Sequence, residues 1–265
     1  MVALTACAAQ AIRALISAPV ERTQPKAVTL NVSAAASLTA SFGEIGKAFE
    51  AKNPGVTVVF NFAGSQQLAS QINNSAPADV FASANQAQMD AVVQGGRVNV
   101  SAIKLFVKNR LVVIYPASNP AGIQTLNDLS RPGLKLVLAD PSVPVGQYVL
   151  DFLDRTVEDA ALGADYKDAV LKNVVSYEQD VKAVLTKVIL GESDAGIVYT
   201  TDAATDMYSK TVQLAIPDHL NIIAVYPIAG INDSSAALTA QAFVDYVLSP
   251  AGQAILASYG FVKIK

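Results

Sequence analysis

The sequence contains one cysteine, one histidine and no tryptophan, and only 15% of its 265 residues are charged. A single cysteine excludes an internal disulfide bond and a cysteine-rich metal site, and a lone histidine is a poor basis for a zinc site. The 19 basic residues against 22 acidic ones give a net charge of −3, which indicates no nucleic-acid partner. No apolar run approaches the roughly 18 residues that cross a membrane.

Apolar residues, by contrast, are abundant. They make up 52% of the chain, and the mean hydropathy is +0.35. This composition provides the surface for a large core and excludes an intrinsically disordered protein. A length of 265 residues corresponds to one large domain or to two of ordinary size.

The N-terminal segment differs from the rest of the chain. Residues 8–26 show no clear hydrophobic period, and we interpret residues 1–26 as a signal remnant and tether. Within it, the run Leu4-Thr5-Ala6-Cys7 resembles the lipobox of bacterial lipoproteins, in which the cysteine becomes the lipidated N-terminus. The alternative is that Cys7 is a free cysteine in a disordered tail.

From residue 28 onward, strand and helix patterns alternate. Residues 28–32 place apolar side chains at every second position, as a strand does, and residues 38–49 place them three and four apart, as one helix face does. Further strands are predicted at 56–62 and 79–82, and further helices at 68–72 and 86–93. Such units build mostly parallel sheets covered by helices, so the fold class is α/β.

The alternation continues to the C-terminus. Strands are predicted at 111–115, 134–139, 195–199 and 222–228, and helices at 126–129, 145–153, 181–190, 238–248 and 252–259. The apolar strands near residues 111 and 224 are natural crossing points between two lobes. We therefore predict a first lobe of residues 27–110 plus 225–265, a second lobe of residues 111–224, and a hinge at the crossing strands.

Several predicted strands are followed by short loops with a small hydroxyl residue or a free backbone amide at the start of a helix. Helix starts carry unpaired N–H groups and a partial positive charge, and so attract anions. Several starts that converge on one cleft would hold an oxyanion without lysine or arginine. The loops are residues 34–37, 62–65 and 140–146.

These segments are similar to those of the molybdate-binding proteins of bacterial molybdate ABC transporters. The resemblance extends over residues 27–265. It rests on the opening strand and loop at residues 28–38, on Phe62-Ala63-Gly64-Ser65, on Asp140-Pro141-Ser142-Val143-Pro144-Val145-Gly146, and on residues 76–84, 196–203 and 249–261.

The resemblance implies a type II periplasmic binding-protein fold, in which two α/β lobes close over the ligand. It implies that Ser37 and Ser65 offer hydroxyl and backbone N–H groups, Val145 and Val181 backbone N–H groups, and Tyr199 its phenol. Such neutral donors suit a dianion whose oxygens only accept hydrogen bonds. The sequence departs from the family at Val145, where a small residue is frequent; a backbone donor tolerates this change.

The resemblance also implies the biological role. It predicts an extracytoplasmic receptor, periplasmic or lipid-anchored through Cys7, that captures molybdate and also tungstate and delivers it as a monomer to an ABC transporter permease. Molybdenum is then bound as an oxyanion, and no cofactor is expected. A donor-only site penalises a protonated anion, because that proton finds no acceptor.

Other interpretations remain open from the residues alone. In the simplest alternative, the two serines serve only as helix caps, which serine favours. The two valines would then be ordinary core residues, and Tyr199 would be an ordinary packed aromatic. A receptor for sulfate, phosphate or a ferric complex, or a sensory or enzymatic descendant of the fold, is the alternative function. No nucleophile elbow of the Gly-x-Ser-x-Gly type and no lysine-containing phosphate loop is present, so we predict that the protein is not an enzyme.

Overall fold

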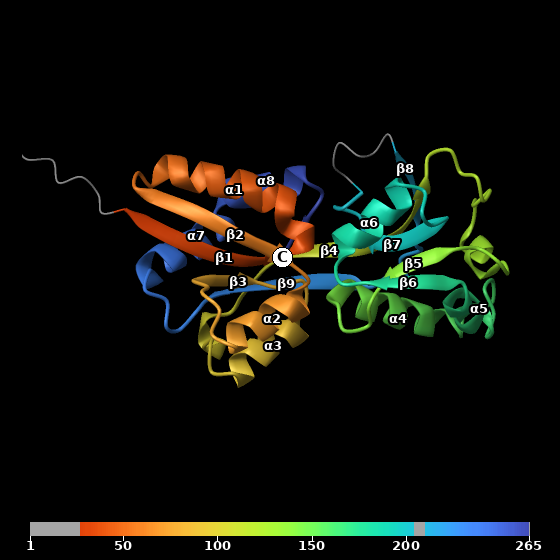
Figure 1. Ribbon diagram of the computed structural model, residues 1–265, viewed down its shortest axis with the longest axis horizontal. Helices are drawn as coiled ribbons and strands as arrows, with labels where there is room; N and C mark the ends of the chain where they lie inside the picture. The colour runs from red at the N-terminus through yellow and green to blue at the C-terminus, as the bar shows by residue number, and fades with distance from the viewer. Residues whose placement is uncertain (1–26, 204–209, 265) are drawn as a thin grey trace, which may run out of the picture.

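The computed structural model describes residues 27–203 and 210–264, so Cys7 and the predicted tether lie outside the described residues. The molecule has two halves that lie side by side (Figure 1). Two long strands, β4 (Lys104–Pro116) and β9 (Ile223–Gly230), run between them. The main path of the sheet has the order β2-β1-β3-β9-β4-β7-β5-β6. The predicted α/β class and two-part architecture are confirmed.

The first half is built on the N-terminal strands. β1 (Val28–Ala35) pairs in parallel with β2 (Val56–Ala63) on one side and with β3 (Val80–Ala82) on the other. β3 then pairs antiparallel with β9, and β9 pairs antiparallel with the first part of β4. The short strand β10 (Val262–Lys263) also pairs with β4. The sheet is therefore parallel at its edge and antiparallel at its centre.

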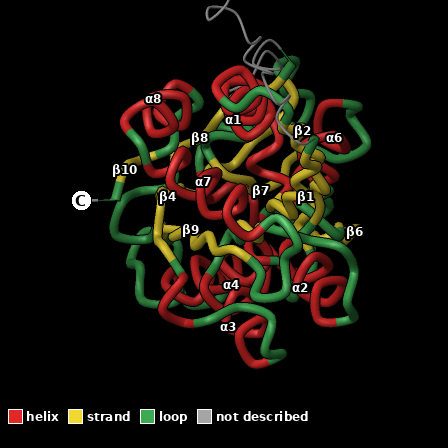
Figure 2. The backbone as a smooth tube through the Cα atoms, turned by 90° about the vertical axis from the view of Figure 1, so that its left-hand side faces the viewer, coloured by secondary structure: helices red, strands yellow, loops and turns green. Residues whose placement is uncertain are grey.

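Helices cover both faces of this half. Helices α1 (Thr39–Lys52) and α8 (Pro250–Ser258) lie on one face, and α2 (Ser65–Asn73) and α3 (Gln86–Gln94) lie on the other (Figures 1 and 2). Helix α7 (Ala237–Leu248) packs on β9 and against α8. Segments from both ends of the chain thus share the first half.

The spacing of aromatic residues explains how α1 is held. Phe42 and Phe49 lie two turns apart on the buried face of α1, which also buries Ile45. Both phenylalanines contact Phe243 of α7 edge to face, at centroid distances of 6.0 and 5.3 Å. Burying a phenylalanine side chain contributes about 1.5–3 kcal/mol to the stability of the fold. This cluster therefore holds α1 against α7 in the first half.

The second half has its own strands and helices. β5 (Leu136–Ala139) pairs in parallel with β6 (Val174–Glu178) and β7 (Ala195–Tyr199), and β8 (Thr211–Ala215) pairs antiparallel with β4. Its helices are α4 (Pro144–Thr156), α5 (Tyr166–Lys172) and α6 (Val181–Ile189). The 3-10 turns of the described chain include η1 (Ala36–Leu38), η2 (Val100–Ala102) and η3 (Leu126–Ser130).

The β4 strand changes partners in its middle. Arg110 is the last residue opposite β9, and Leu111 is the first opposite β7. At this point the Asn221 side chain accepts from the Leu111 N–H at 3.0 Å and donates to the Leu111 carbonyl at 2.9 Å. The side chain thereby substitutes for a strand partner where the sheet switches. The lobe boundaries at residues 111 and 224 stay a prediction.

The helices of the structure are too short or too polar to cross a lipid bilayer, as far as the described residues go. Among residues 27–203 and 210–264, none of them combines the length and the hydropathy of a membrane-crossing helix.

Candidate ligand-binding site

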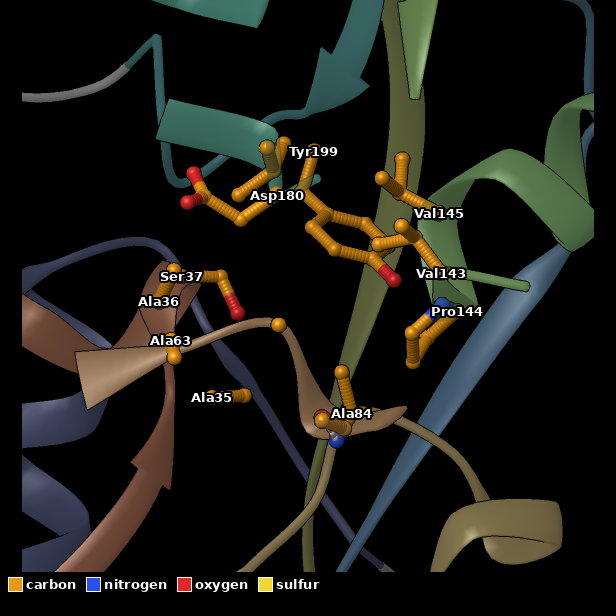
Figure 3. A pocket seen from close by; sticks show the side chains of 13 residues that line it. Ala35, Ala36, Ser37, Ala63, Ala84, Val143, Pro144, Val145, Asp180 and Tyr199 are labelled. Atoms are coloured by element: carbon orange, nitrogen blue, oxygen red, sulfur yellow. Dashed lines mark hydrogen bonds between the residues drawn. The ribbon is translucent and has the colours of Figure 1, made fainter. Parts of the chain in front are cut away.

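A small cavity lies where the two halves meet, and all five residues singled out in the sequence line it (Figure 3). The space in it that the centre of a water-sized sphere can occupy is about 10 Å³, roughly the room for one small group and far less than the roughly 300–1,000 Å³ of a drug-sized pocket. The first half contributes Ala35, Ala36, Ser37, Ala63, Gly64, Ser65 and Ala84. The second half contributes Val143, Pro144, Val145, Asp180, Val181 and Tyr199.

Ser37 lies directly after β1, in the turn η1. Helix α1 begins later, its N-cap is Leu38, and no side chain caps it. The Ser37 hydroxyl instead contacts the Tyr226 hydroxyl, with 2.9 Å between the two oxygens. In Figure 3 the Ser37 oxygen faces the interior of the cavity. This geometry argues against the interpretation of Ser37 as a simple helix cap.

Ser65 is the first residue of α2, one position after the N-cap Gly64. Its hydroxyl oxygen accepts a hydrogen bond from the Ala84 N–H at 3.0 Å, so it does not cap its own helix. Because the oxygen is occupied as an acceptor, the hydroxyl proton of Ser65 is free to point elsewhere. Ser65 is only 1% exposed, and it lines the cavity, so a bound ligand is the natural recipient of that proton.

Two helix starts of the second half also face the cavity. Val145 is the second residue of α4, and Val181 is the first residue of α6. First-turn N–H groups have no partner within their own helix. Asp180 caps α6 by accepting from the N–H groups of Lys182 and Ala183, which leaves the Val181 N–H for another acceptor. Both valine side chains are buried core residues, as the alternative interpretation expected.

Tyr199 ends β7 and is only 1% exposed. Its hydroxyl oxygen is buried and has no hydrogen-bond partner among the described residues, an arrangement that costs about 1–3 kcal/mol unless a ligand completes it. Burial raises the pKa of Tyr199 well above its ordinary value, and nearby Tyr226, Tyr148 and Asp202 raise it further. The phenol therefore keeps its proton, and Figure 3 shows its oxygen facing the same space as that of Ser37.

The cavity wall contains no lysine, arginine or histidine in the part of the chain that the structure describes. Asp180 lines it, but the Asp180 carboxylate is engaged with the start of α6. Nearby, Lys182 forms an ion pair at 2.8 Å with Asp202, whose side chain is 0% exposed. Burial raises the pKa of Asp202, and Lys182 opposes that rise. The cavity thus presents neutral donors rather than a compensating positive charge.

Sequence reasoning missed the residues that orient these donors. Tyr226 and Asn109 belong to β9 and β4 and reach Ser37 only through the folded sheet. Ala84 is a small residue after β3 whose backbone N–H meets Ser65. Asp180 was recognisable, because an aspartate directly before an apolar helix is a favoured N-cap.

The other candidate chemistry of the sequence lies elsewhere. His219 is exposed and pairs with Asp159 at 2.8 Å, far along the chain from the cavity residues. Over residues 27–203 and 210–264, the His, Cys, Asp and Glu side chains form no group of three or more able to hold a metal ion.

Comparison with known proteins places the chain in a family. Residues 30–262 match the model of the family described as "Bacterial extracellular solute-binding protein". The chain is 41% identical over 247 residues to the molybdate-binding protein ModA of Mycobacterium tuberculosis, which covers 93% of this chain and 89% of that protein.

Solved structures agree with this fold. The substrate-binding domain of a putative molybdenum ABC transporter from Clostridium difficile is 29% identical, with a TM-score of 0.66, over 90% of this chain and all of that one. The periplasmic molybdate-binding protein of Azotobacter vinelandii is 20% identical, with a TM-score of 0.76, over 89% of this chain and all of that one; this likeness shows the fold alone. The protein belongs to the bacterial extracellular solute-binding proteins, and its relatives there place it in the ModA family.

Proposed function

We propose that this protein is an extracytoplasmic receptor that binds molybdate, and also tungstate, and delivers it to an ABC importer. One observation carries the proposal: among the described residues, the buried Tyr199 hydroxyl has no hydrogen-bond partner, and it shares a small cavity with two serine hydroxyls and with no basic side chain. An oxyanion that only accepts hydrogen bonds would complete every one of these donors. The 41% identity to mycobacterial ModA over 93% of the chain supports the same ligand.

The proposed contacts come from both halves. Ser37 and Ser65 donate through their hydroxyl and backbone N–H groups, Val145 and Val181 through their backbone N–H groups, and Tyr199 through its phenol. The partial positive charge of the helix starts spreads the charge of the dianion over fixed dipoles. Molybdenum enters as part of the anion, so the protein needs no cofactor and no metal ligand of its own.

We propose further that the two halves are lobes that close on the ligand about β4 and β9. This proposal is supported by the change of strand partners between Arg110 and Leu111 and by donors that lie on both sides of that point. Small-angle scattering with and without molybdate tests it. An unchanged radius of gyration at saturating ligand would contradict closure.

Members of this solute-binding family act outside the cytoplasm, and we propose that Cys7 anchors this one as a lipoprotein that works as a monomer. The Leu4-Thr5-Ala6-Cys7 motif supports the anchor. Expression in a host that processes lipoproteins, with detergent phase partition of wild type and Cys7→Ser, tests it. The wild type should enter the detergent phase and the variant should not; equal partition would refute the anchor.

The first experiment on function is a calorimetric titration with molybdate, tungstate, sulfate and phosphate. Strong binding of molybdate and tungstate alone would support the proposed receptor function. A preference for sulfate or phosphate would mean that the protein binds a different oxyanion. Absence of binding to all four would refute an oxyanion role. Ser37→Ala should weaken molybdate binding about ten- to a hundredfold, as expected for one hydrogen bond to a charged group. Ser33→Ala is the matched control, because Ser33 is buried in β1 but does not line the cavity.

A further inference from the structure

A chain of buried hydrogen bonds leads from the cavity to the strand crossing. The Ser37 hydroxyl contacts the hydroxyl of Tyr226, which is 0% exposed and contacts the Asn109 side-chain nitrogen at 3.4 Å. The same nitrogen donates to the Thr201 hydroxyl at 2.8 Å. Asn109 precedes the point where β4 changes partners, and Tyr226 does not line the cavity.

The other atoms around Asn109 fix the orientation of its amide, and this favours one direction for the Ser37–Tyr226 hydrogen bond. The Asn109 side-chain oxygen accepts from the Arg110 N–H at 2.9 Å and from the Thr200 hydroxyl at 3.1 Å. A backbone N–H is always a donor, so the atom facing it is the amide oxygen and the other atom is the NH₂ group. The NH₂ group therefore donates to the Tyr226 oxygen, and the phenol proton is available for Ser37.

We infer that Tyr226 is a positioning residue that orients Ser37 as a hydrogen-bond donor toward the ligand. When the Ser37 oxygen accepts the Tyr226 proton, one of its two lone pairs is occupied and its own proton points to the cavity, so the oxygen is a poorer acceptor for a proton on the ligand. The inference rests on the proposed oxyanion function and deepens it. Tyr226 would favour a tetrahedral anion that carries no proton, such as molybdate or sulfate, over one that does, such as hydrogen phosphate.

Ser65 provides an internal parallel. Its oxygen is occupied by the Ala84 N–H, a backbone donor that cannot reverse. Both serine hydroxyls are thus set as donors, one by the main chain and the other by a side chain. Of these two orienting groups, only the Tyr226 side chain can be replaced by mutation, and Tyr226 does not line the cavity.

The test is a competition assay on the whole protein, with molybdate displaced by sulfate or by phosphate near neutral pH. The two competitors are close in size, but only phosphate carries a proton there. Tyr226→Phe should narrow the preference for sulfate over phosphate by about tenfold, the scale of one unmatched hydrogen bond. Loss of a merely structural contact would weaken both competitors equally, and that result would overturn the inference.

Three controls make the result specific. Tyr148→Phe removes a nearby tyrosine hydroxyl that contacts the Ala84 carbonyl rather than either serine, and should leave the ratio unchanged. In a Ser37→Ala background, Tyr226→Phe should no longer alter the ratio. If Tyr226→Phe does not fold, Asn109→Ala replaces it, because the Tyr226 oxygen loses its Asn109 donor and can then accept the Ser37 proton.

The outcomes separate the two proposals. If the wild type binds no oxyanion, the proposed function fails and the inference fails with it. If the wild type binds molybdate but the sulfate-to-phosphate ratio is the same in Tyr226→Phe, the function stands and the role of Tyr226 is refuted. A narrowed ratio in Tyr226→Phe, but not in Tyr148→Phe, supports it.

Discussion

The two sides of the cavity are lined by different types of residue. The first half lines it with alanine, glycine and serine, whereas the second half lines it with valine, proline, aspartate and tyrosine. Small side chains let hydroxyl groups and the main chain approach a ligand closely, and bulky apolar ones exclude water, which strengthens every hydrogen bond inside. Under the proposed function, one side would recognise the anion mainly through side-chain hydroxyls and the other mainly through buried backbone amides and one phenol.

This difference predicts different sensitivities to mutation. A hydroxyl donor is lost by a single substitution, but a backbone donor survives any side chain that leaves its helix in place. The second side should therefore be vulnerable through the supports of α4 and α6 rather than through Val145 or Val181. The buried ion pair beside α6 is the support whose loss should have the largest effect.

Lys182→Met should lower the free energy of unfolding by about 2–3 kcal/mol, because it leaves the Asp202 carboxylate buried and unpaired. The figure is below the roughly 3–5 kcal/mol of a fully buried pair because Lys182 is 31% exposed. Urea unfolding measures it. Lys182→Met combined with Asp202→Asn should recover most of the loss; additive losses would contradict the pairing.

The same variant should respond to pH in a defined direction. Burial raises the pKa of Asp202 in the folded state, so the folded protein takes up this proton at higher pH than the unfolded chain does. The stabilising effect of that proton is fully present below the unfolded pKa and is lost as pH rises through the folded pKa. The deficit of Lys182→Met should therefore shrink toward acid pH, whereas Asp202→Asn should remove this dependence.

On the first side, the two serines should be separable. Ser65→Ala and Ser37→Ala should each weaken molybdate binding by about ten- to a hundredfold. Ser65→Ala also removes the acceptor of the buried Ala84 N–H, at a cost of about 1–3 kcal/mol. Tyr226 keeps Asn109 as a partner when Ser37 is replaced. The ligand-free melting temperature should therefore fall more in Ser65→Ala; equal melting temperatures would refute the contrast.

The next prediction concerns the contact between the two sides. A methyl group at Gly64 would lie 2.5 Å from the Gln179 carbonyl oxygen across the cavity, so Gly64→Ala should oppose the close approach of the halves. We expect molybdate affinity to fall by about tenfold, with little change in the unfolding of the free protein. Gly43→Ala is the control, because nothing lies within 4 Å of its added methyl. Equal affinities would show that the approach is unimportant.

The sequence predicted much of the fold, because most elements show clear periods. The predicted helix at residues 181–190 is α6 (Val181–Ile189), whose apolar residues share one face. The elements that escaped prediction, α5, β6, β8 and β10, are short and have partly exposed residues, so their periods are weak. The antiparallel centre of the sheet also escaped, since the direction of strand pairing depends on the crossing of β4 and β9.

The candidate site, like the fold, could be predicted from the sequence only in part. Local motifs and the family resemblance identified the five lining residues, since each lies at the end of a strand, just after one, or in the first turn of a helix. The residues that orient them could not be predicted from the sequence. Tyr226, for example, is 189 positions from Ser37 and contacts it only in the folded sheet. Residues that face a ligand leave a local pattern, whereas their supports depend on tertiary contacts.

The smallest predicted effect concerns a polar contact between the two halves, formed by residues close in sequence to Ser65 and Asp180. The Gln67 side-chain nitrogen donates to the Gln179 side-chain oxygen at 2.6 Å, and both groups are exposed. Gln67→Ala should therefore weaken molybdate binding only about two- to fivefold, mainly through faster dissociation. Gln71→Ala is the matched control, since Gln71 lies on the same helix but bonds to Asn61 within the first half. Stopped-flow dissociation rates that are equal in the two variants would show that closure depends on the ligand alone.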